Sequence, residues 1–155
     1  MKIFLLTHSK EPLKKTNTGK LVKQIMGEQA EVIIWERKKP NPQIIQLIKD
    51  NNIALLYPSS KNEISVEKST IENYILIDGT WQQAQKIFNL STYLHIIPTF
   101  NVSNDSPSEF VLRRNQREGC LCTAECAIEI LKDILASIFI NAKIYISEDM
   151  LAAVY

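Results

Sequence analysis

The tetrapeptide Asp78-Gly79-Thr80-Trp81 follows a short apolar run, and its residue types could serve either a ligand site or a turn. Gly79 permits backbone angles that other residues avoid, and Thr80 and Gln83 have the spacing of a capping box at a helix start. A carboxylate that ends a buried strand needs partners to stay charged, and such carboxylates concentrate at functional sites. Asp78 is therefore a candidate site residue. Thr80 could instead serve only as a helix cap, and Trp81 could serve only to cover the sheet.

Two other polar segments follow apolar runs. Pro58-Ser59-Ser60 could offer hydroxyls and backbone groups to a ligand, or it could be a plain turn. Thr18-Gly19-Lys20 looks like the end of a phosphate-binding loop. A P-loop, however, needs glycine at position 14 and Ser or Thr at position 21, where this chain has Lys14 and Leu21. The sequence therefore excludes a P-loop.

Basic side chains gather in two places, although 18 basic and 17 acidic residues leave a net charge of only +1. The segment Lys10–Lys23 holds five lysines and one glutamate, while the residues from Glu125 onward carry an acidic excess. Arginines before the last helical segment could hold phosphate, carboxylate or an RNA backbone, or could be solvated. These are Arg113, Arg114 and Arg117. This segregation favours a polyanion that approaches one side of the molecule.

Cysteine content and hydropathy point to a soluble cytoplasmic protein without a metal. The three cysteines, Cys120, Cys122 and Cys126, are an odd number and fit free thiols in a reducing compartment. Zinc sites favour pairs of cysteines two to four residues apart with further Cys or His ligands, whereas this chain has only these three cysteines and two distant histidines. The apolar runs are far shorter than the roughly 20 residues of a membrane span, and no signal-peptide pattern opens the chain.

Short apolar runs alternate with segments of helical periodicity, which is the rhythm of an α/β fold with a mostly parallel sheet flanked by helices. A length of 155 residues predicts one domain over residues 1–155. In such a sheet, ligands bind at the carboxyl ends of the strands. Strands are predicted at Ile3–Thr7, Glu31–Trp35, Ile53–Tyr57, Tyr74–Ile77 and Tyr93–Ile97, helices at Gly19–Met26, Pro42–Lys49, Thr80–Phe88 and Thr123 to about Ile140, and a loop at Asn101–Ser108.

Taken together and in order, these segments resemble the DTW-domain family, whose name describes the Asp-x-Thr-Trp motif. The resemblance extends from about residue 7 to residue 131. Its elements are His8 to Glu11, Thr16-Asn17-Thr18-Gly19, Tyr57-Pro58-Ser59, Asp78-Gly79-Thr80-Trp81, Leu112-Arg113-Arg114 and Leu121-Cys122-Thr123-Ala124-Glu125-Cys126.

The resemblance implies a SPOUT-like fold with a C-terminal trefoil knot and the activity of a tRNA-uridine aminocarboxypropyltransferase. S-adenosylmethionine would donate the alkyl group to N3 of a uridine in tRNA. We expect Asp78, Thr80 and Trp81 to act in catalysis, with Asp78 as candidate general base, as a ligand of the cofactor's ammonium, or as a brace of the turn. The expected cofactor-binding residues are Tyr57, Pro58, Ser59, Asp78, Leu121, Cys122, Thr123 and Glu125, and the expected RNA-binding residues are His8, Lys10, Thr18, Lys20, Arg113, Arg114 and Arg117.

The chain departs from the family pattern at two positions. Val111 stands where many relatives have Arg, and Cys122 replaces a Ser that would start a capping box with Glu125. Thr123 could take over the cap. Two alternatives to the transferase therefore stay open: an S-adenosylmethionine-dependent RNA methyltransferase, and an RNA-binding module that has lost its chemistry.

Overall fold

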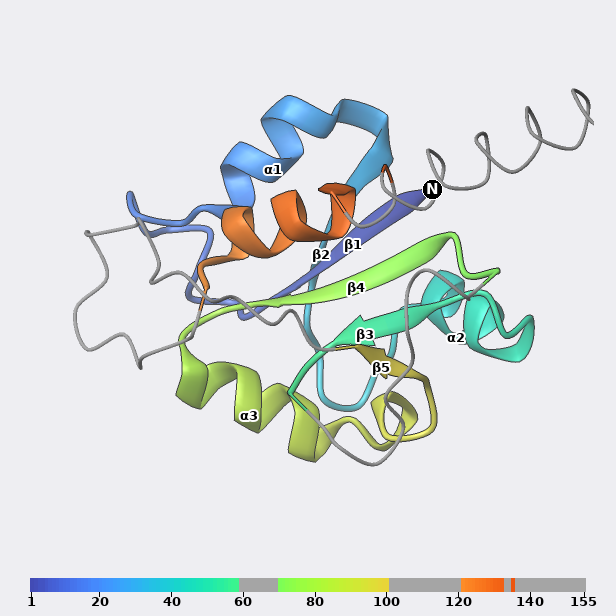
Figure 1. The fold of residues 1–155 in the computed structure, drawn as a ribbon. Coiled ribbons are helices and arrows are strands. Elements are labelled where there is room, and N and C mark those ends of the chain that lie inside the picture. The colour runs from blue at the N-terminus through green and yellow to red at the C-terminus, as the bar shows by residue number, and fades with distance from the viewer. Residues whose placement is uncertain (59–69, 101–120, 133–134, 136–155) are drawn as a thin grey trace, which may run out of the picture.

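The computed structural model describes residues 1–58, 70–100, 121–132 and 135, and it confirms the α/β class (Figure 1). Within these residues five strands form one sheet in the order β2-β1-β4-β3-β5, and each neighbouring pair is parallel. All carboxyl ends therefore lie at one edge of the sheet. The strands are β1 (Lys2–Thr7), β2 (Ala30–Ile34), β3 (Ala54–Leu56), β4 (Asn73–Asp78) and β5 (Thr99–Phe100).

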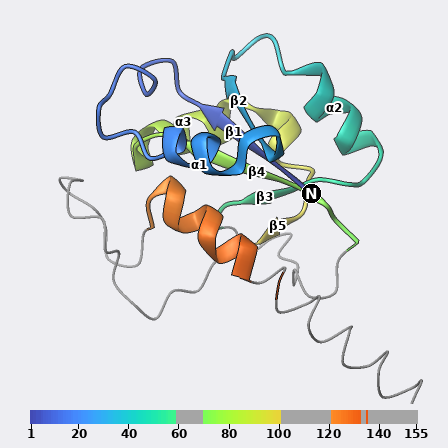
Figure 2. The same cartoon turned by 90° about the horizontal axis from the view of Figure 1, so that it is seen from above.

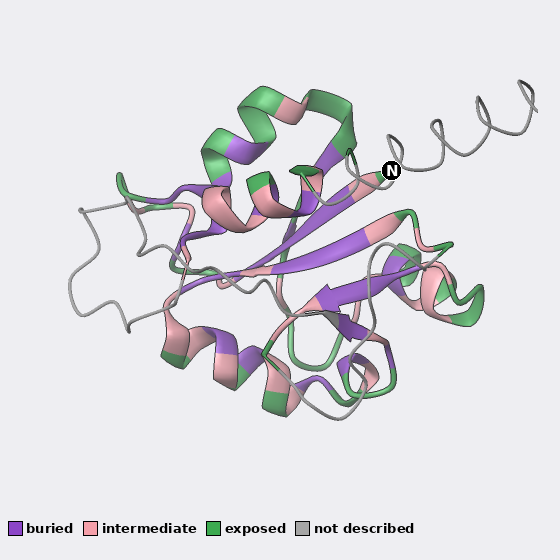
Figure 3. Ribbon diagram, in the orientation of Figure 1, coloured by how far each residue is buried: buried purple, intermediate pink, exposed green. Residues whose placement is uncertain are grey.

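Helices cover both faces of the sheet (Figures 1 and 2). On one face lie α1 (Gly19–Met26) and the helix at residues 123–132; on the other lie α2 (Pro42–Lys49) and α3 (Trp81–Leu90). Alternate side chains of each strand feed the two cores, so that Leu5 packs toward α1 and Leu6 toward α2 and α3. Burial on both faces explains why β1 and β4, in the middle of the sheet, have nearly continuous apolar sequences (Figure 3).

The connections leave the middle of the sheet in opposite directions. The chain passes from β1 through α1 to β2 at one edge, whereas it passes from β4 through α3 toward β5 at the other edge. Since β1 and β4 are neighbours, their carboxyl ends form the topological switch point at which open α/β sheets bind ligands.

One predicted strand is wrong. Residues 93–97 do not form a strand; Thr92–Leu94 is a short 3-10 helix, and the edge strand β5 begins only at Thr99. Leu94 and Ile97 are buried, whereas His95 and Ile96 are exposed, and this spacing of three fits a helical turn rather than a strand. The apolar residue types alone did not distinguish a helical turn from a strand.

The remaining predicted elements within the described residues are confirmed to within a few positions, including the helix from Thr123, which is seen over 123–132 and at 135. The predicted loop at 101–108 and the C-terminal residues 136–155, where the knot was expected, lie outside the described residues. No helix in the described ranges is long and apolar enough to cross a membrane. Within the same ranges, no three His, Cys, Asp or Glu side chains are grouped to hold a metal ion.

Candidate functional site

The carboxyl ends of β1 and β4 bring Thr7 and Asp78 into direct register. The backbone N–H of His8, the first residue after β1, donates to the carbonyl of Asp78 at 3.0 Å. Asp78 is only 3% exposed, and its side chain faces α1 because Leu76 and Tyr74, two and four residues earlier, pack on that face. The expected site residue thus stands at the topological switch point.

Both carboxylate oxygens of Asp78 accept hydrogen bonds from segments that are distant in sequence. Asn17 Nδ2 donates to Oδ2 at 2.8 Å, and Thr123 Oγ1 donates to Oδ1 at 2.8 Å. All three side chains are buried, as is Thr18. We call these four residues, Asn17, Thr18, Asp78 and Thr123, the Asp78 cluster. It joins the loop before α1, the end of β4 and the start of the 123–132 helix.

Each part of Asn17-Thr18-Gly19 has a distinct contact. The side-chain oxygen of Asn17 accepts from the N–H of Lys20 at 2.9 Å, so Asn17 satisfies a backbone N–H in the first turn of α1 while its amide nitrogen donates to Asp78. A Cβ on Gly19 would lie 2.7 Å from Asp78 Oδ2, which is closer than real Cβ contacts come. Glycine is therefore required at position 19 by the close approach of Asp78 to α1.

The 123–132 helix is capped in two ways. Glu125 Oε2 accepts from the backbone N–H of Cys122 at 2.7 Å, which keeps one half of a capping box. Thr18 Oγ1, from the other end of the chain, accepts from the N–H of Ala124 at 3.3 Å. The suggestion that Thr123 replaces the missing cap is not what the structure shows, because its hydroxyl donates to Asp78.

The predicted capping box at Thr80 is confirmed. Thr80 Oγ1 accepts from the N–H of Gln83, and Gln83 Oε1 accepts from the N–H of Thr80 at 2.7 Å. The amide nitrogen of Gln83 lies 3.4 Å from His8 Nδ1, so the start of α3 also contacts the loop after β1. The Asp78 turn is thereby held on both sides of the sheet.

The expected cofactor residue Tyr57 and the expected catalytic residue Trp81 lie on the opposite face from the Asp78 carboxylate. The rings of Tyr57 and Trp81 stack with centroids 5.9 Å apart, and Tyr57 also stacks on Phe88 at 4.1 Å, on the α3 side of the sheet. Burial raises the pKa of Tyr57, so its phenol stays protonated at neutral pH. The candidate site residues thus form two groups at one edge of the sheet: the rings of Tyr57 and Trp81, and the Asp78 cluster with the 121–125 segment.

His8 is held as a hydrogen-bond acceptor rather than as a cation. Its Nδ1 lies 3.3 Å from the N–H of Lys10, which donates to it, and its ring stacks on Trp35. Burial, with Lys86 next in importance, lowers the pKa of His8 below its usual value of 6.5. At neutral pH this imidazole therefore carries no charge for an RNA phosphate.

We expect His8 to make folding stability depend on pH. Because the folded state holds the imidazole neutral, the unfolded chain takes up its proton more readily, and stability falls as the pH drops below about 6.5 through the folded-state pKa. The loss of melting temperature between pH 7 and pH 5 should be smaller in His8→Phe than in wild type. Equal slopes of melting temperature against pH in His8→Phe and wild type would contradict the assignment.

The expected RNA-binding residues are only partly described. Lys10 and Lys20 are exposed at the edge of the sheet that holds the Asp78 cluster, whereas the hydroxyl of Thr18 serves the helix cap. Lys14 pairs with the buried Glu11, and Lys23 donates to the carbonyls of Gly27 and Ala30. Ser59, Arg113, Arg114 and Arg117 lie outside the described residues, and Pro58 is exposed.

Sequence reasoning overlooked a third basic group. Arg37, Lys38 and Lys39 are exposed in the loop that follows β2, at the same edge of the sheet as Lys10 and Lys20. Three consecutive basic residues directly after a predicted strand were the available signal. Asn17 and Gly19 were also given no role of their own, because their contacts are with a residue about sixty positions away.

Comparison with known proteins identifies a family and several relatives. The sequence profile of the DTW domain matches residues 1–154. The chain is similar to the "tRNA-uridine aminocarboxypropyltransferase 2" of Drosophila melanogaster, with 29% identity over 137 residues, which cover 83% of this chain and 54% of the fly protein. The proteins of the same name from Macaca fascicularis and Mus musculus are each 26% identical over 136 residues, covering 81% of this chain and 45% of theirs. The chain thus spans about half the length of these curated relatives, and no solved structure matches it significantly.

Proposed function

The chain belongs to the DTW domain family, and on that premise we propose that it is an S-adenosylmethionine-dependent tRNA-uridine aminocarboxypropyltransferase. It would transfer the 3-amino-3-carboxypropyl group to N3 of a uridine in tRNA. The names of the relatives support this activity and substrate. The observation that carries the proposal is the position of the family motif: Asp78-Gly79-Thr80-Trp81 ends β4 at the topological switch point, where this class of sheet binds ligands.

The residues at this edge fit the proposed donor. The helix starts at Thr80 and Thr123 converge on Asp78, because Thr80 follows it by two residues and Thr123 donates to it. Helix N-termini favour a carboxylate such as that of the methionine part. The half-buried rings of Tyr57 and Trp81 offer an aromatic surface on which adenine can stack. When bound, S-adenosylmethionine supplies a sulfonium that activates the γ-carbon of its methionine part.

The main task of the protein is then to position two reactants. A sulfonium activates its methyl group as well as the γ-carbon, so the choice between the two products depends on orientation. The Asp78 cluster fixes the starts of α1 and the 123–132 helix relative to β4. With both oxygens engaged and the carboxylate buried, Asp78 is better suited to hold these elements than to take the N3 proton. We assign it a positioning role.

The RNA would approach the edge that carries Lys10, Lys20 and the Arg37–Lys39 run, since these exposed cations suit phosphates. The target uridine has to be unpaired or turned out of its helix to expose N3. Arg113, Arg114 and Arg117 remain part of the proposed RNA surface on the strength of the family pattern. Family membership likewise supports a single SPOUT-like domain with a C-terminal trefoil knot, and we place the protein in the cytoplasm.

Product analysis tests the proposed reaction. Incubation of the full chain with S-adenosylmethionine and unmodified tRNA should yield 3-(3-amino-3-carboxypropyl)uridine and, in equal amount, methylthioadenosine, both identified by mass spectrometry. Release of S-adenosylhomocysteine with a methylated nucleoside would show a methyltransferase instead. Retention of tRNA without any by-product would show a binding module. Heat-denatured protein serves as the control for chemical alkylation.

A further inference from the structure

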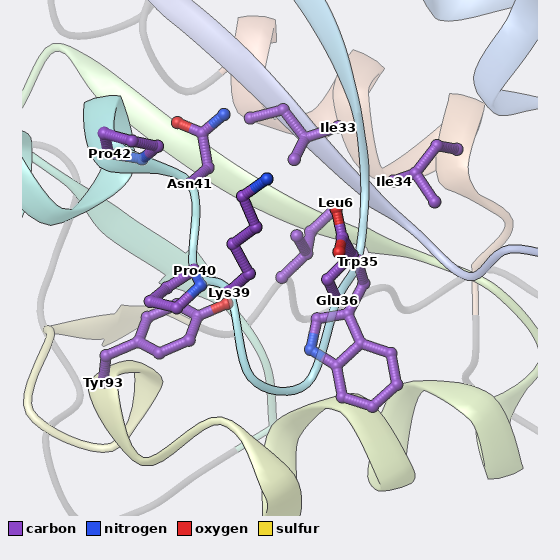
Figure 4. Close-up of a pocket in the computed structure, with 10 residues that line it drawn as sticks. All are labelled: Leu6, Ile33, Ile34, Trp35, Glu36, Lys39, Pro40, Asn41, Pro42 and Tyr93. Atoms are coloured by element: carbon purple, nitrogen blue, oxygen red, sulfur yellow. The ribbon is translucent and has the colours of Figure 1, made fainter.

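A pocket of about 130 Å³ lies at the carboxyl ends of β1 and β2, beside the loop that leads into α2 (Figure 4). Its floor includes the buried side chains of Leu6 and Ile33, and its walls include Trp35, Pro40 and Tyr93. The exposed residues Glu36 and Lys39 form part of its rim, so the pocket opens to solvent. The functions assigned above do not use it.

The two aromatic walls are held by one buried hydroxyl. Ser91, which is 1% exposed, accepts a hydrogen bond from Trp35 Nε1 at 2.9 Å, and its side chain also hydrogen-bonds Tyr93. Trp35 stacks in addition on His8, which follows β1. Figure 4 shows Trp35 and Tyr93 on two sides, with the Lys39 side chain between them. The walls are thus held in place, and a ring that enters between them has to displace only the exposed side chain of Lys39.

Size and charge together define the ligand class. An apolar cavity of about 150 Å³ accepts a single benzene ring, so this pocket has room for one six-membered ring. Aromatic and proline walls suit a flat π system, and stacking on aromatic side chains is a common mode of RNA base recognition. Arg37, Lys38 and Lys39, exposed at the rim and next to it, suit the phosphate attached to such a ring.

We propose that this pocket binds one unpaired pyrimidine nucleotide of the RNA substrate, at a position other than the modified uridine, with its base between Trp35 and Tyr93 and its phosphate at Lys39. The proposal rests on the proposed function, since it takes RNA as the substrate. The pocket adjoins the candidate site through the stacking of Trp35 on His8, whose N–H donates to Asp78. A base held there would set the register of the RNA relative to the Asp78 cluster.

A nucleotide titration tests the pocket without the reaction. The indole N–H resonance of Trp35, assigned by its loss in Trp35→Phe, is followed by NMR while uridine 5′-monophosphate is added to the full chain. We expect it to shift, and we expect Lys39→Glu and Tyr93→Leu to weaken this binding about tenfold. Lys49→Glu, a matched change at the far end of α2, should not weaken it. The proposal would be overturned if the nucleotide did not shift the Trp35 resonance. It would also be overturned if methylthioadenosine shifted this resonance with higher affinity, because the pocket would then be a purine site.

Kinetics with tRNA separate this proposal from the proposed function. Lys39→Glu and Tyr93→Leu should raise KM for tRNA about tenfold with kcat unchanged, and Lys49→Glu should leave both at wild-type values. Lys39 is exposed, so its variant stays informative if Tyr93→Leu fails to fold. Normal transfer by wild type with an unchanged KM in Lys39→Glu would overturn the pocket and leave the transferase intact. A wild-type protein that transfers nothing would overturn the proposed function, while the nucleotide titration still decides whether the pocket binds.

Discussion

Replacing Asp78 by alanine is expected to lower the free energy of unfolding by about 3 kcal/mol and to reduce transfer about 100-fold or more. The change leaves Asn17 Nδ2 and Thr123 Oγ1 buried without their acceptor. A buried donor that loses its hydrogen-bond partner costs free energy of folding. The loss of transfer follows because the elements that orient the reactants are no longer joined, and small misplacements cost about this much. Denaturant unfolding and the product assay measure the two effects.

Asp78→Asn distinguishes positioning from proton transfer at the same residue. Its amide oxygen can accept from Asn17 Nδ2, and its NH₂ group can donate to the Thr123 hydroxyl, which is able to act as an acceptor. The cluster can therefore close without a carboxylate, and we expect transfer within about tenfold of wild type. Removal of a general base costs about 10²- to 10⁴-fold. A loss of that size in a folded Asp78→Asn protein would restore the role of Asp78 as base.

Gly19→Ala is expected to destabilise the protein by about 2 kcal/mol, although alanine favours a helix over glycine by about 1 kcal/mol. The added Cβ would lie 2.7 Å from Asp78 Oδ2, and Asp78 is buried and bonded on both oxygens, so α1 has to move away from the site. Transfer should fall with stability because Asn17 moves with the helix. Thermal unfolding and the product assay report both.

Gln24→Ala is the matched control for this change, since Gln24 is exposed in the same helix and its substitution should alter stability by less than about 0.5 kcal/mol. A Gly19→Ala protein that is more stable than wild type and fully active would show that helix propensity, and not the contact with Asp78, governs this position.

The parts of the fold that were predictable from sequence are those that depend on residues close together in the chain. Because β1 and β4 are buried on both faces, their sequences are nearly unbroken apolar runs. The capping box of α3 is likewise local, since Thr80 and Gln83 are only three positions apart. Residues 93–97 misled because a buried 3-10 turn and a short strand contain the same apolar residue types. Only the three-residue spacing of the buried Leu94 and Ile97 distinguishes the turn from a strand. A segment of five residues is too short for such a periodicity to be recognised from sequence.

Three of the four residues of the Asp78 cluster were predicted as site residues, but Asn17 and the contacts within the cluster were not. Position after a strand identified Asp78, and the family pattern pointed to Thr18 and Thr123. Nothing local says that Asn17 and Thr123 share one carboxylate, because 61 and 45 residues separate them from Asp78. The two faces of the sheet also separate Tyr57 and Trp81 from that carboxylate, which a list of motifs does not reveal.

The Asp78 cluster also dictates when the site can form during protein synthesis. Its first two members, Asn17 and Thr18, leave the ribosome before β2 does, yet their acceptor and donor partners are 61 and 106 residues away in the chain. The β1–α1 unit must therefore wait, with the start of α1 only partly held, until the residues near position 124 have emerged. Contacts of such long sequence separation close slowly and late. A nascent or prematurely ended chain would thus hold most of its sheet before it could hold its reactants.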